Sequence, residues 1–276
     1  MSHRLTFIIL LVCVVLVLIL VLPFSILSPF PPFGVESRDS FAPEPVLLED
    51  HAVVHVNMTT IPERFLSDWF ANNMRRMLTT MRGNYVWWCN IPPVFETTLE
   101  PYVVSPKVQA LLEEFPNFRL FTTNEDYGPI TKVLGPLHNP DIPNTSALLI
   151  CDDDIQYLPD MVKIAAAHFS RDPSRVYTFC GTGVHGFRGF VVQKILCQKI
   201  PDNMPISCRR IDDDLLDLHF KGRITPITYN GKNNWACTVD ESDWGDLHTS
   251  TKRALKHDHR PPMVKICQRD FYTLKK

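Results

Sequence analysis

The sequence predicts an α/β protein with an open, mostly parallel sheet flanked by helices, preceded by a single N-terminal transmembrane helix. Three observations lead to this prediction. Short apolar runs alternate with helical periodicity from about residue 52 to residue 180. The apolar run 147–151 is followed directly by three aspartates. Residues 5–22 are apolar except for Thr6, which is about the length that a membrane helix needs.

The N-terminal region is expected to form a membrane anchor and a stem. We assign a cytosolic tail to residues 1–4, a transmembrane signal anchor to 5–27 and a stem rich in proline and acid to 28–50. Arg4 precedes the apolar stretch and acidic residues dominate after it, so the positive-inside rule places the N-terminus in the cytosol. This predicts a single-pass type II membrane protein whose domain lies outside the cell or in a lumen, and we expect the Golgi or another secretory compartment. A cleaved signal peptide is the alternative.

Residues 51–276 are expected to form the globular domain. Strands are predicted where apolar, β-branched or aromatic residues cluster, at 52–58, 85–89, 118–121, 147–151 and 176–180. Helices are predicted to begin near Pro62 and to cover 105–114, part of 127–137, and 159–169. After about residue 181 the pattern becomes irregular, which divides the domain into 51–181 and 182–276.

The aspartates that follow the 147–151 strand are the main candidate site. Open α/β sheets bind ligands at the carboxyl ends of their strands. If the chain stays extended there, Asp152 and Asp154 point to one side and Asp153 to the other. Neighbouring carboxylates attract a hard divalent cation, so a metal site is the first hypothesis. The alternative is a solvated acidic loop near a helix N-terminus.

Two further segments carry candidate chemistry. Asp213 and Asp214 belong to a second acidic triplet before an apolar helix, which suits either a first helical turn or a general base. Lys132 lies one turn into a helix after Asp126, where it is either solvated or positioned to meet an anion. A glycine-rich segment, 183–191, is either a ligand-covering loop or a hairpin.

Composition limits the classes of partner. The formal net charge is −2 for 276 residues, which gives no basic face for nucleic acid. Eight cysteines suit an oxidising lumen; Cys151 and Cys180 are expected to be buried thiols, and the disulfide candidates are Cys197, Cys208, Cys237 and Cys267. Of two sequons, Asn57 falls on a strand, whereas Asn144 falls in a loop suited to a glycan.

The order of these motifs resembles that of GT-A-fold glycosyltransferases with an Asp-x-Asp motif. The resemblance rests on a Thr-Thr-Ile-Pro-x-Arg segment at 59–64, Asp-Tyr-Gly-Pro-x-Thr-Lys at 126–132, and the two acidic clusters. It covers about residues 52–220. It implies a nucleotide-binding half at 51–181 and an acceptor-side half at 182–276.

The resemblance also implies roles for individual residues. It implies a nucleotide-diphosphate sugar as donor, a glycan, glycoprotein or glycolipid as acceptor, Mn²⁺ or Mg²⁺ as cofactor, and an inverting hexosyl transfer. Asp214, with Asp213 beside it, matches the acidic pair that holds the base; since this chain has Asp-Asp where many relatives have Glu-Asp, either aspartate could be the base. His248 would add a third metal ligand to Asp152 and Asp154. The residues implied to bind the nucleotide sugar are Thr59, Thr60, Arg64, Asp126, Lys132, Asp152 and Asp153.

Two other functions are compatible with the acidic clusters. One is a different metal-dependent phosphoryl or nucleotidyl transferase, in which paired aspartates also serve. The other is a non-enzymatic lumenal module that binds Ca²⁺. The sequence alone does not identify the sugar, the acceptor or the stereochemical outcome.

Overall fold

The computed structural model describes residues 53–96, 98–181, 183–186, 188–200, 208, 212–228 and 237–238. The chain divides into two compact units, Met1–Val46 and Leu47–Lys276, and all described residues belong to the second. The predicted tail, membrane anchor and stem, and His248, lie outside the described residues. Within the described ranges, no helix has the length and apolar character needed to cross a membrane.

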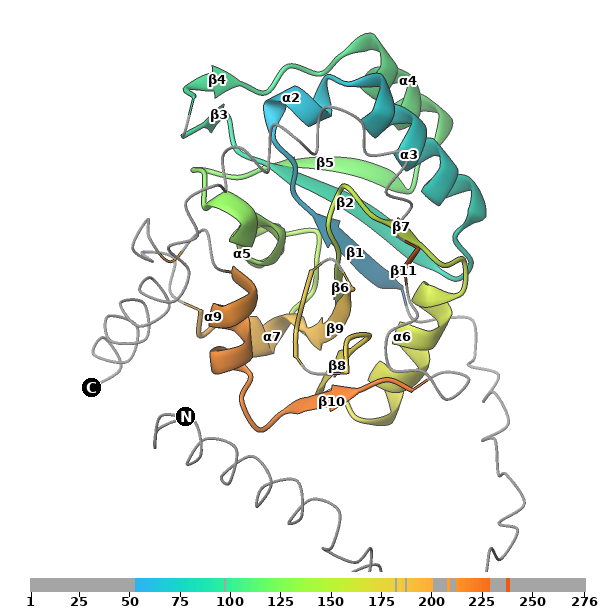
Figure 1. Ribbon diagram of the computed structural model, residues 1–276, viewed down its shortest axis with the longest axis vertical. Helices are drawn as coiled ribbons and strands as arrows, with labels where there is room; N and C mark the ends of the chain where they lie inside the picture. The colour runs from blue at the N-terminus through green and yellow to red at the C-terminus, as the bar shows by residue number, and fades with distance from the viewer. Residues whose placement is uncertain are drawn as a thin grey trace, which may run out of the picture. The chain divides into compact units, whose positions relative to one another are not determined.

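A seven-stranded sheet forms the centre of the second unit (Figure 1). Its order is β10-β8-β9-β6-β1-β2-β5. The strands are β1 (Val54–Met58), β2 (Tyr85–Ile91), β5 (Phe118–Thr122), β6 (Ala147–Ile150), β8 (Val176–Thr178), β9 (Phe190–Gln193) and β10 (Ile224–Pro226). All neighbouring pairs are parallel except those made by β9, which runs antiparallel to β6 and β8. The predicted mostly parallel sheet is therefore confirmed.

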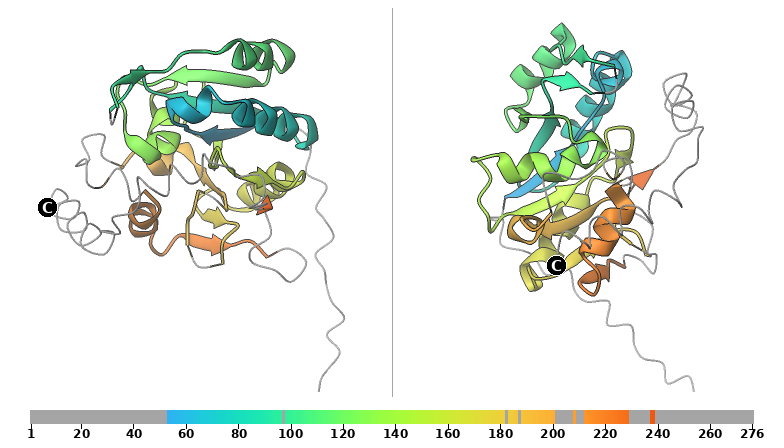
Figure 2. Two further views of the ribbon diagram at one scale, coloured as in Figure 1. Left: turned by 45° about the horizontal axis from the view of Figure 1, so that its top comes forward. Right: turned by 90° about the vertical axis from the view of Figure 1, so that its left-hand side faces the viewer.

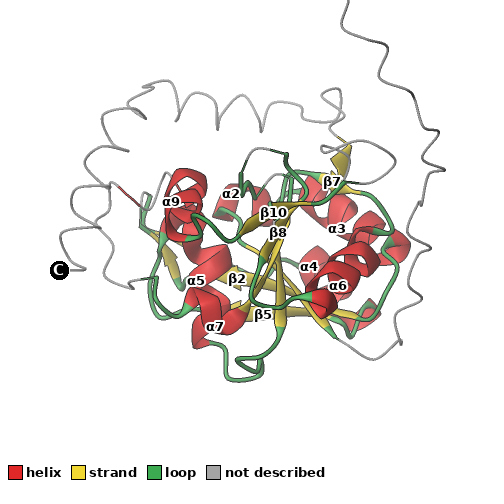
Figure 3. Ribbon diagram, turned by 90° about the horizontal axis from the view of Figure 1, so that it is seen from below, coloured by secondary structure: helices red, strands yellow, loops and turns green. Residues whose placement is uncertain are grey.

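Helices cover both faces of the sheet (Figure 3). One face packs against α3 (Asp68–Thr80), α4 (Pro106–Glu114) and α6 (Met161–Arg171). The other packs against α5 (Thr131–His138), α7 (Lys194–Cys197) and α9 (Asp212–His219). The short helix α2 (Pro62–Phe65) follows β1, and a 3-10 turn (Gly128–Ile130) precedes α5.

Local sequence explains where the longer helices begin. Ser67 accepts a hydrogen bond from the amide of Phe70 at 3.1 Å, which caps α3. Ser105 caps α4 in the same way through the amide of Val108, and proline follows it at the first helical position. The predicted helices at 105–114 and 159–169 therefore form close to the expected positions.

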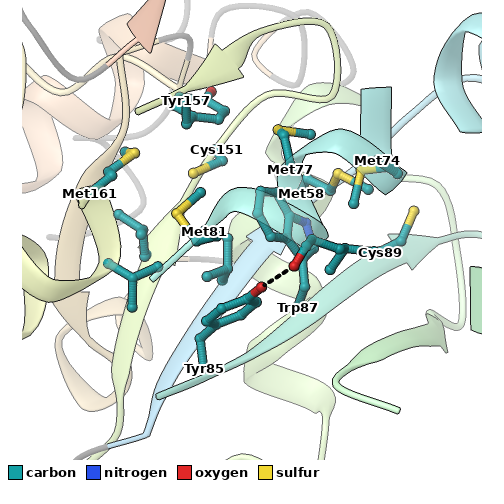
Figure 4. Close-up of a cluster of buried hydrophobic side chains, with 14 of the residues drawn as sticks. Met58, Met74, Met77, Met81, Tyr85, Trp87, Cys89, Cys151, Tyr157 and Met161 are labelled. Atoms are coloured by element: carbon teal, nitrogen blue, oxygen red, sulfur yellow. Dashed lines mark hydrogen bonds between the residues drawn. The ribbon is translucent and has the colours of Figure 1, made fainter. Parts of the chain in front are cut away.

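The core on the α3 side is rich in methionine and aromatic residues (Figure 4). Every residue of β1 is buried, as expected for a central parallel strand covered on both faces. Met58, Met74 and Trp87 are all fully buried in this cluster. The Tyr85 hydroxyl reaches the carbonyl of Leu78 at 3.1 Å, which ties the start of β2 to the end of α3.

Strands after residue 181 join the same sheet as those before it. β9 pairs with β6, and β10 pairs with β8 at the edge opposite β5 (Figure 2). The strands β9 and β10, which are four and three residues long, lie in the half where the sequence pattern is irregular. Two small ribbons complete the unit: β3 (Val94–Phe95) pairs with β4 (Glu100–Pro101), and β7 (Gln156–Tyr157) pairs with β11 (Cys237–Thr238).

The cysteine predictions are partly confirmed. Cys151 and Cys180 are buried free thiols, as expected. Cys197 is also a buried free thiol, so its candidacy for a disulfide is wrong; it packs in the apolar core on the α7 side of the sheet. Cys208 is disulfide-bonded, and its partner is not among the described side chains. Asn57 is fully buried and Asn144 is exposed, which fits a glycan at the second sequon only.

Candidate functional site

The sheet order places the two main motifs next to each other. From β1 the chain builds outward through β2 to β5 on one side, and then returns to β6 on the other side of β1. Such a reversal opens a crevice at the carboxyl ends of the two strands, where open α/β sheets bind ligands. Residues 59–64 follow β1 and residues 152–154 follow β6, so both motifs lie at this switch point.

Asp153 is the most buried of the three aspartates. Its carboxylate accepts a hydrogen bond from Thr60 Oγ1 at 2.5 Å and pairs with Arg64 Nη1 at 2.6 Å. Asn73 of α3 donates to its carbonyl at 3.2 Å. Tyr102 donates to the carbonyl of Thr60 at 2.6 Å. Asp153 therefore joins the end of β1 to the end of β6.

Asp154 shares Arg64 with Asp153. Arg64 Nη1 lies 3.2 Å from Asp154 Oδ2, whose side chain is 25% exposed. Burial and the neighbouring charge of Asp153 raise the pKa of Asp154 to about 7, although Arg64 opposes the shift. The pKa of Arg64 is raised despite its burial, because Asp153 and Asp154 stabilise the guanidinium charge.

The chain does not remain extended after β6, and the alternation expected for an extended chain is therefore wrong. β6 ends at Ile150 and the chain turns at Asp153 and Asp154. Asp152 faces Lys132, with Nζ 2.6 Å from Oδ1, whereas Asp153 and Asp154 face Arg64. Two cations thus divide the three carboxylates between them.

Lys132 connects the first acidic triplet to the second. Its Nζ is 2.7 Å from Asp212 Oδ2 as well as 2.6 Å from Asp152 Oδ1, and the residue is 4% exposed. Burial lowers the pKa of Lys132, but the two carboxylates outweigh it and raise the pKa well above its usual value. Burial and Asp212 raise the pKa of Asp152, an effect that Lys132 opposes.

The segment 183–186 packs against the start of α9. His185 Nδ1 lies 3.3 Å from Asp213 Oδ2, and the Gly186 amide donates to Asp213 Oδ1 at 3.0 Å. Burial acts to raise the pKa of Asp213, but His185 and the Gly186 amide lower it overall. The Val184 amide donates to Asp217 at 2.6 Å. Asp214 is exposed, and the described residues offer its carboxylate no ion pair.

The remaining predicted residues have structural partners at the same edge. Thr59 donates to the carbonyl of Asn90, at the end of β2, at 2.8 Å. Asp126 accepts hydrogen bonds from the amides of Gly128 and Glu96, at 2.7 and 2.9 Å. These contacts hold the ends of β1, β2 and β5 together, so both residues shape the crevice rim.

Within the described part of the chain, the carboxylates at the crevice outnumber the cations. Asp152, Asp153, Asp154, Asp212 and Asp213 form ion pairs there with Arg64, Lys132 and His185. Among the described residues, no three His, Cys, Asp or Glu side chains converge on a metal position. The side chains of Asp152 and Asp154 are 28% and 25% exposed and offer hard oxygen donors. Mg²⁺ often takes only one or two protein carboxylates and completes its coordination with water, so the chemistry of these two side chains suits a hard divalent cation.

Four residues of this network were not predicted from the sequence: Tyr157, His185, Asp212 and Asp217. His185 and Asp212 do lie in segments that the sequence had marked, the glycine-rich run and the second triplet. Tyr157 carried no signal, because its contacts are made only in the folded chain. Its hydroxyl accepts from the Asp152 amide at 2.8 Å and donates to the Gly186 carbonyl at 3.0 Å.

No family model matches this chain, and no curated protein matches it. Several solved structures are similar at low identity. Staphylococcus aureus TarS 1–349, also solved in complex with UDP-GlcNAc, is 13% identical over 77% of this chain and 67% of its own, with a TM-score of 0.45. A 4-diphosphocytidyl-2C-methyl-D-erythritol synthase is 10% identical over 71% and 96%, with a TM-score of 0.42. The glycosyltransferase GlyE of Streptococcus pneumoniae TIGR4 is 13% identical over 76% and 52%, with a TM-score of 0.38.

The chain spans 42% of a longer TarS chain and about half of GlyE. Likeness at these scores assigns no chemistry to this chain.

Proposed function

We propose that this chain is a membrane-anchored glycosyltransferase that moves a sugar from a nucleotide-diphosphate sugar to an acceptor hydroxyl, with Mn²⁺ or Mg²⁺ as cofactor. One observation carries the proposal. Two partly buried carboxylates, Asp152 and Asp154, follow β6 at the switch point of a mostly parallel sheet, where the described side chains supply more carboxylates than cations. The motif order of the sequence supports the same function.

The donor and its cation are assigned to the crevice between β1 and β6. Asp152 and Asp154 would hold the cation, with His248 as a further ligand from outside the described residues. The cation supplies Lewis-acid stabilisation of the diphosphate as it leaves. Thr59, Asp126 and the ends of β1 and β5 would border the nucleotide. Asp153 is assigned to positioning, because Thr60 and Arg64 already occupy its carboxylate.

The proton of the acceptor hydroxyl is assigned to Asp214. A general base needs a carboxylate that can reach the hydroxyl and accept its proton. Asp214 is exposed at the start of α9, whereas Asp213 accepts hydrogen bonds that lower its pKa and make it a weaker base. Attack by the hydroxyl on the anomeric carbon, opposite the leaving diphosphate, gives an inverting transfer. The acceptor is a glycan, glycoprotein or glycolipid of a secretory compartment.

A donor screen tests the proposal. The purified full chain is incubated with UDP- and GDP-sugars, with Mn²⁺, Mg²⁺ or EDTA, and release of UDP or GDP is measured. We expect release only with a metal, and loss of release in Asp154→Asn. Asp160→Asn is the matched control, because Asp160 lies on the same segment but pairs with exposed Arg82.

Three other results of this screen would each contradict the proposed function in a different way. No turnover and no UDP or GDP binding with Mn²⁺ would reject a glycosyltransferase. Release of inorganic phosphate or pyrophosphate would indicate a phosphoryl or nucleotidyl transferase. Stabilisation by Ca²⁺ with no nucleotide effect would indicate a calcium-binding module.

A further inference from the structure

Lys132 is a buried cation between two acidic segments that are far apart in the sequence. It lies on α5, near the helix start, and its side chain is 5% exposed. Its ammonium pairs with Asp152 after β6 and with Asp212 at the start of α9. The ammonium donates a hydrogen bond to Asp152 Oδ1 at 2.6 Å, whereas Asp212 Oδ2 is an ion-pair partner at 2.7 Å.

The backbone of Gly186 covers this pair. A Cβ at Gly186 would overlap Lys132 Nζ and Asp152 Oδ1. The Gly186 amide donates to Asp213 at 3.0 Å, and its carbonyl accepts from Tyr157, whose hydroxyl also accepts from the Asp152 amide. Only glycine lets the backbone approach this closely. The covering segment therefore connects the residues after β6 with the start of α9.

We infer that Lys132 and Asp212 form a positioning pair that fixes Asp152 toward the donor and holds the start of α9 in place, and that Lys132 does not itself bind the diphosphate. The inference rests on the proposed function. A phosphate would have to reach an ammonium that is nearly inaccessible beneath Gly186 and already faces two carboxylates. Asp213 and Asp214 follow Asp212 directly, so the pair ties the acceptor side of the site to its donor side.

Asp212→Asn distinguishes the two roles of Lys132, because it removes one partner of the ammonium and touches no substrate in either scheme. For a positioning pair, we expect kcat to fall about tenfold or more while the donor KM changes less than about threefold. The dissociation constant of UDP or GDP with Mn²⁺, measured by calorimetry, is expected to change equally little. If Lys132 binds the diphosphate, the same substitution releases the ammonium and tightens nucleotide binding.

Gly186→Ala gives a second measurement that removes no charged group but displaces Lys132 Nζ and Asp152 Oδ1 from each other. It is expected to lower kcat more than it changes KM, as Asp212→Asn does. Lys132→Met is expected to lower kcat similarly, with a melting curve to check folding. Lys163→Met, an exposed lysine on α6, is the matched control and is expected to keep the activity of the unmodified chain.

The outcomes separate this inference from the proposed function. An unmodified chain without turnover on any donor would overturn the proposed function, and the inference with it. An active chain whose Asp212→Asn variant keeps full kcat, or binds nucleotide more tightly, would overturn the inference alone. A Lys132→Met variant that folds, keeps its kcat and loses about tenfold or more in nucleotide affinity would do the same.

Discussion

Replacing Arg64 with methionine tests the buried connection between β1 and β6. The arginine side chain is 12% exposed, and its main partner, Asp153, is 6% exposed. Removing one partner of a buried pair leaves the other charge uncompensated, at a cost of about 3–5 kcal/mol. We expect about 3 kcal/mol, the lower end, because Thr60 still donates to Asp153. For a unit of this size the melting temperature would fall by roughly 6–12 °C.

Urea and thermal denaturation of the full chain measure this loss. Arg75→Met is the matched control, because Arg75 pairs with Glu114 across α3 and α4 while both side chains remain 43% and 48% exposed. An exposed pair contributes about 0–1 kcal/mol, so the control is expected to lie near the unmodified chain. Asp153→Asn in the Arg64→Met background is expected to recover part of the stability, because it removes the uncompensated charge. Equal losses for Arg64→Met and Arg75→Met would refute the reasoning.

Three further predictions concern pH, backbone conformation and packing. The pKa of Asp154 is raised to about 7 in the folded chain, from about 3.8 unfolded, so its stabilising contribution is complete below pH 4 and is lost as pH rises through 7. Without added metal, Asp154→Asn should therefore gain urea resistance relative to the unmodified chain at pH 8 but not at pH 4; an equal gain at both would contradict this. Gly189 and Gly222 both have positive φ, but a Cβ at Gly189 would also overlap Met161, while one at Gly222 meets nothing. Gly222→Ala should cost about 1–2 kcal/mol in urea denaturation and Gly189→Ala clearly more, and the reverse order would argue against the contact. Met74 is fully buried, so Met74→Ala should cost about 2–5 kcal/mol and Met74→Leu less than about 1.5 kcal/mol; equal losses would show that the cavity is not the cause.

The helices and strands that the sequence predicted best are those marked by a local pattern, such as a proline at a helix start or a continuous apolar run. Pro62 begins a helix as expected, and the apolar run 147–150 is a fully buried strand. Their patterns depend on residues within one turn or one strand. The second half of the domain was harder to predict, because no alternation of apolar runs and helical periodicity marks β9 and β10, which the fold forms by pairing with β6 and β8.

The sequence proposed which residues form the candidate site, but it did not predict which side chains contact one another there. The sequence marked Lys132 as a candidate phosphate ligand, but the fold surrounds it with Asp152 and Asp212. The sequence proposed Asp152 and Asp154 as a metal pair, because alternate side chains of an extended chain point to the same side. In the structure the chain turns after β6, and Asp153 contacts Arg64. Side-chain partners of this kind depend on sheet order, which local patterns do not encode.

The sequence by itself determined the α/β class and the position of the carboxylates at a strand end. It also showed a basic residue in each of the segments 59–64 and 126–132, Arg64 and Lys132. Those properties follow from periodicity and residue chemistry, which act over a few positions. Only the tertiary structure decided which carboxylate meets which cation, and that Gly186 closes over Lys132. The physical reason is that β6 pairs with β1 across about 90 residues, and this pairing brings together charges whose energies depend on distance and burial.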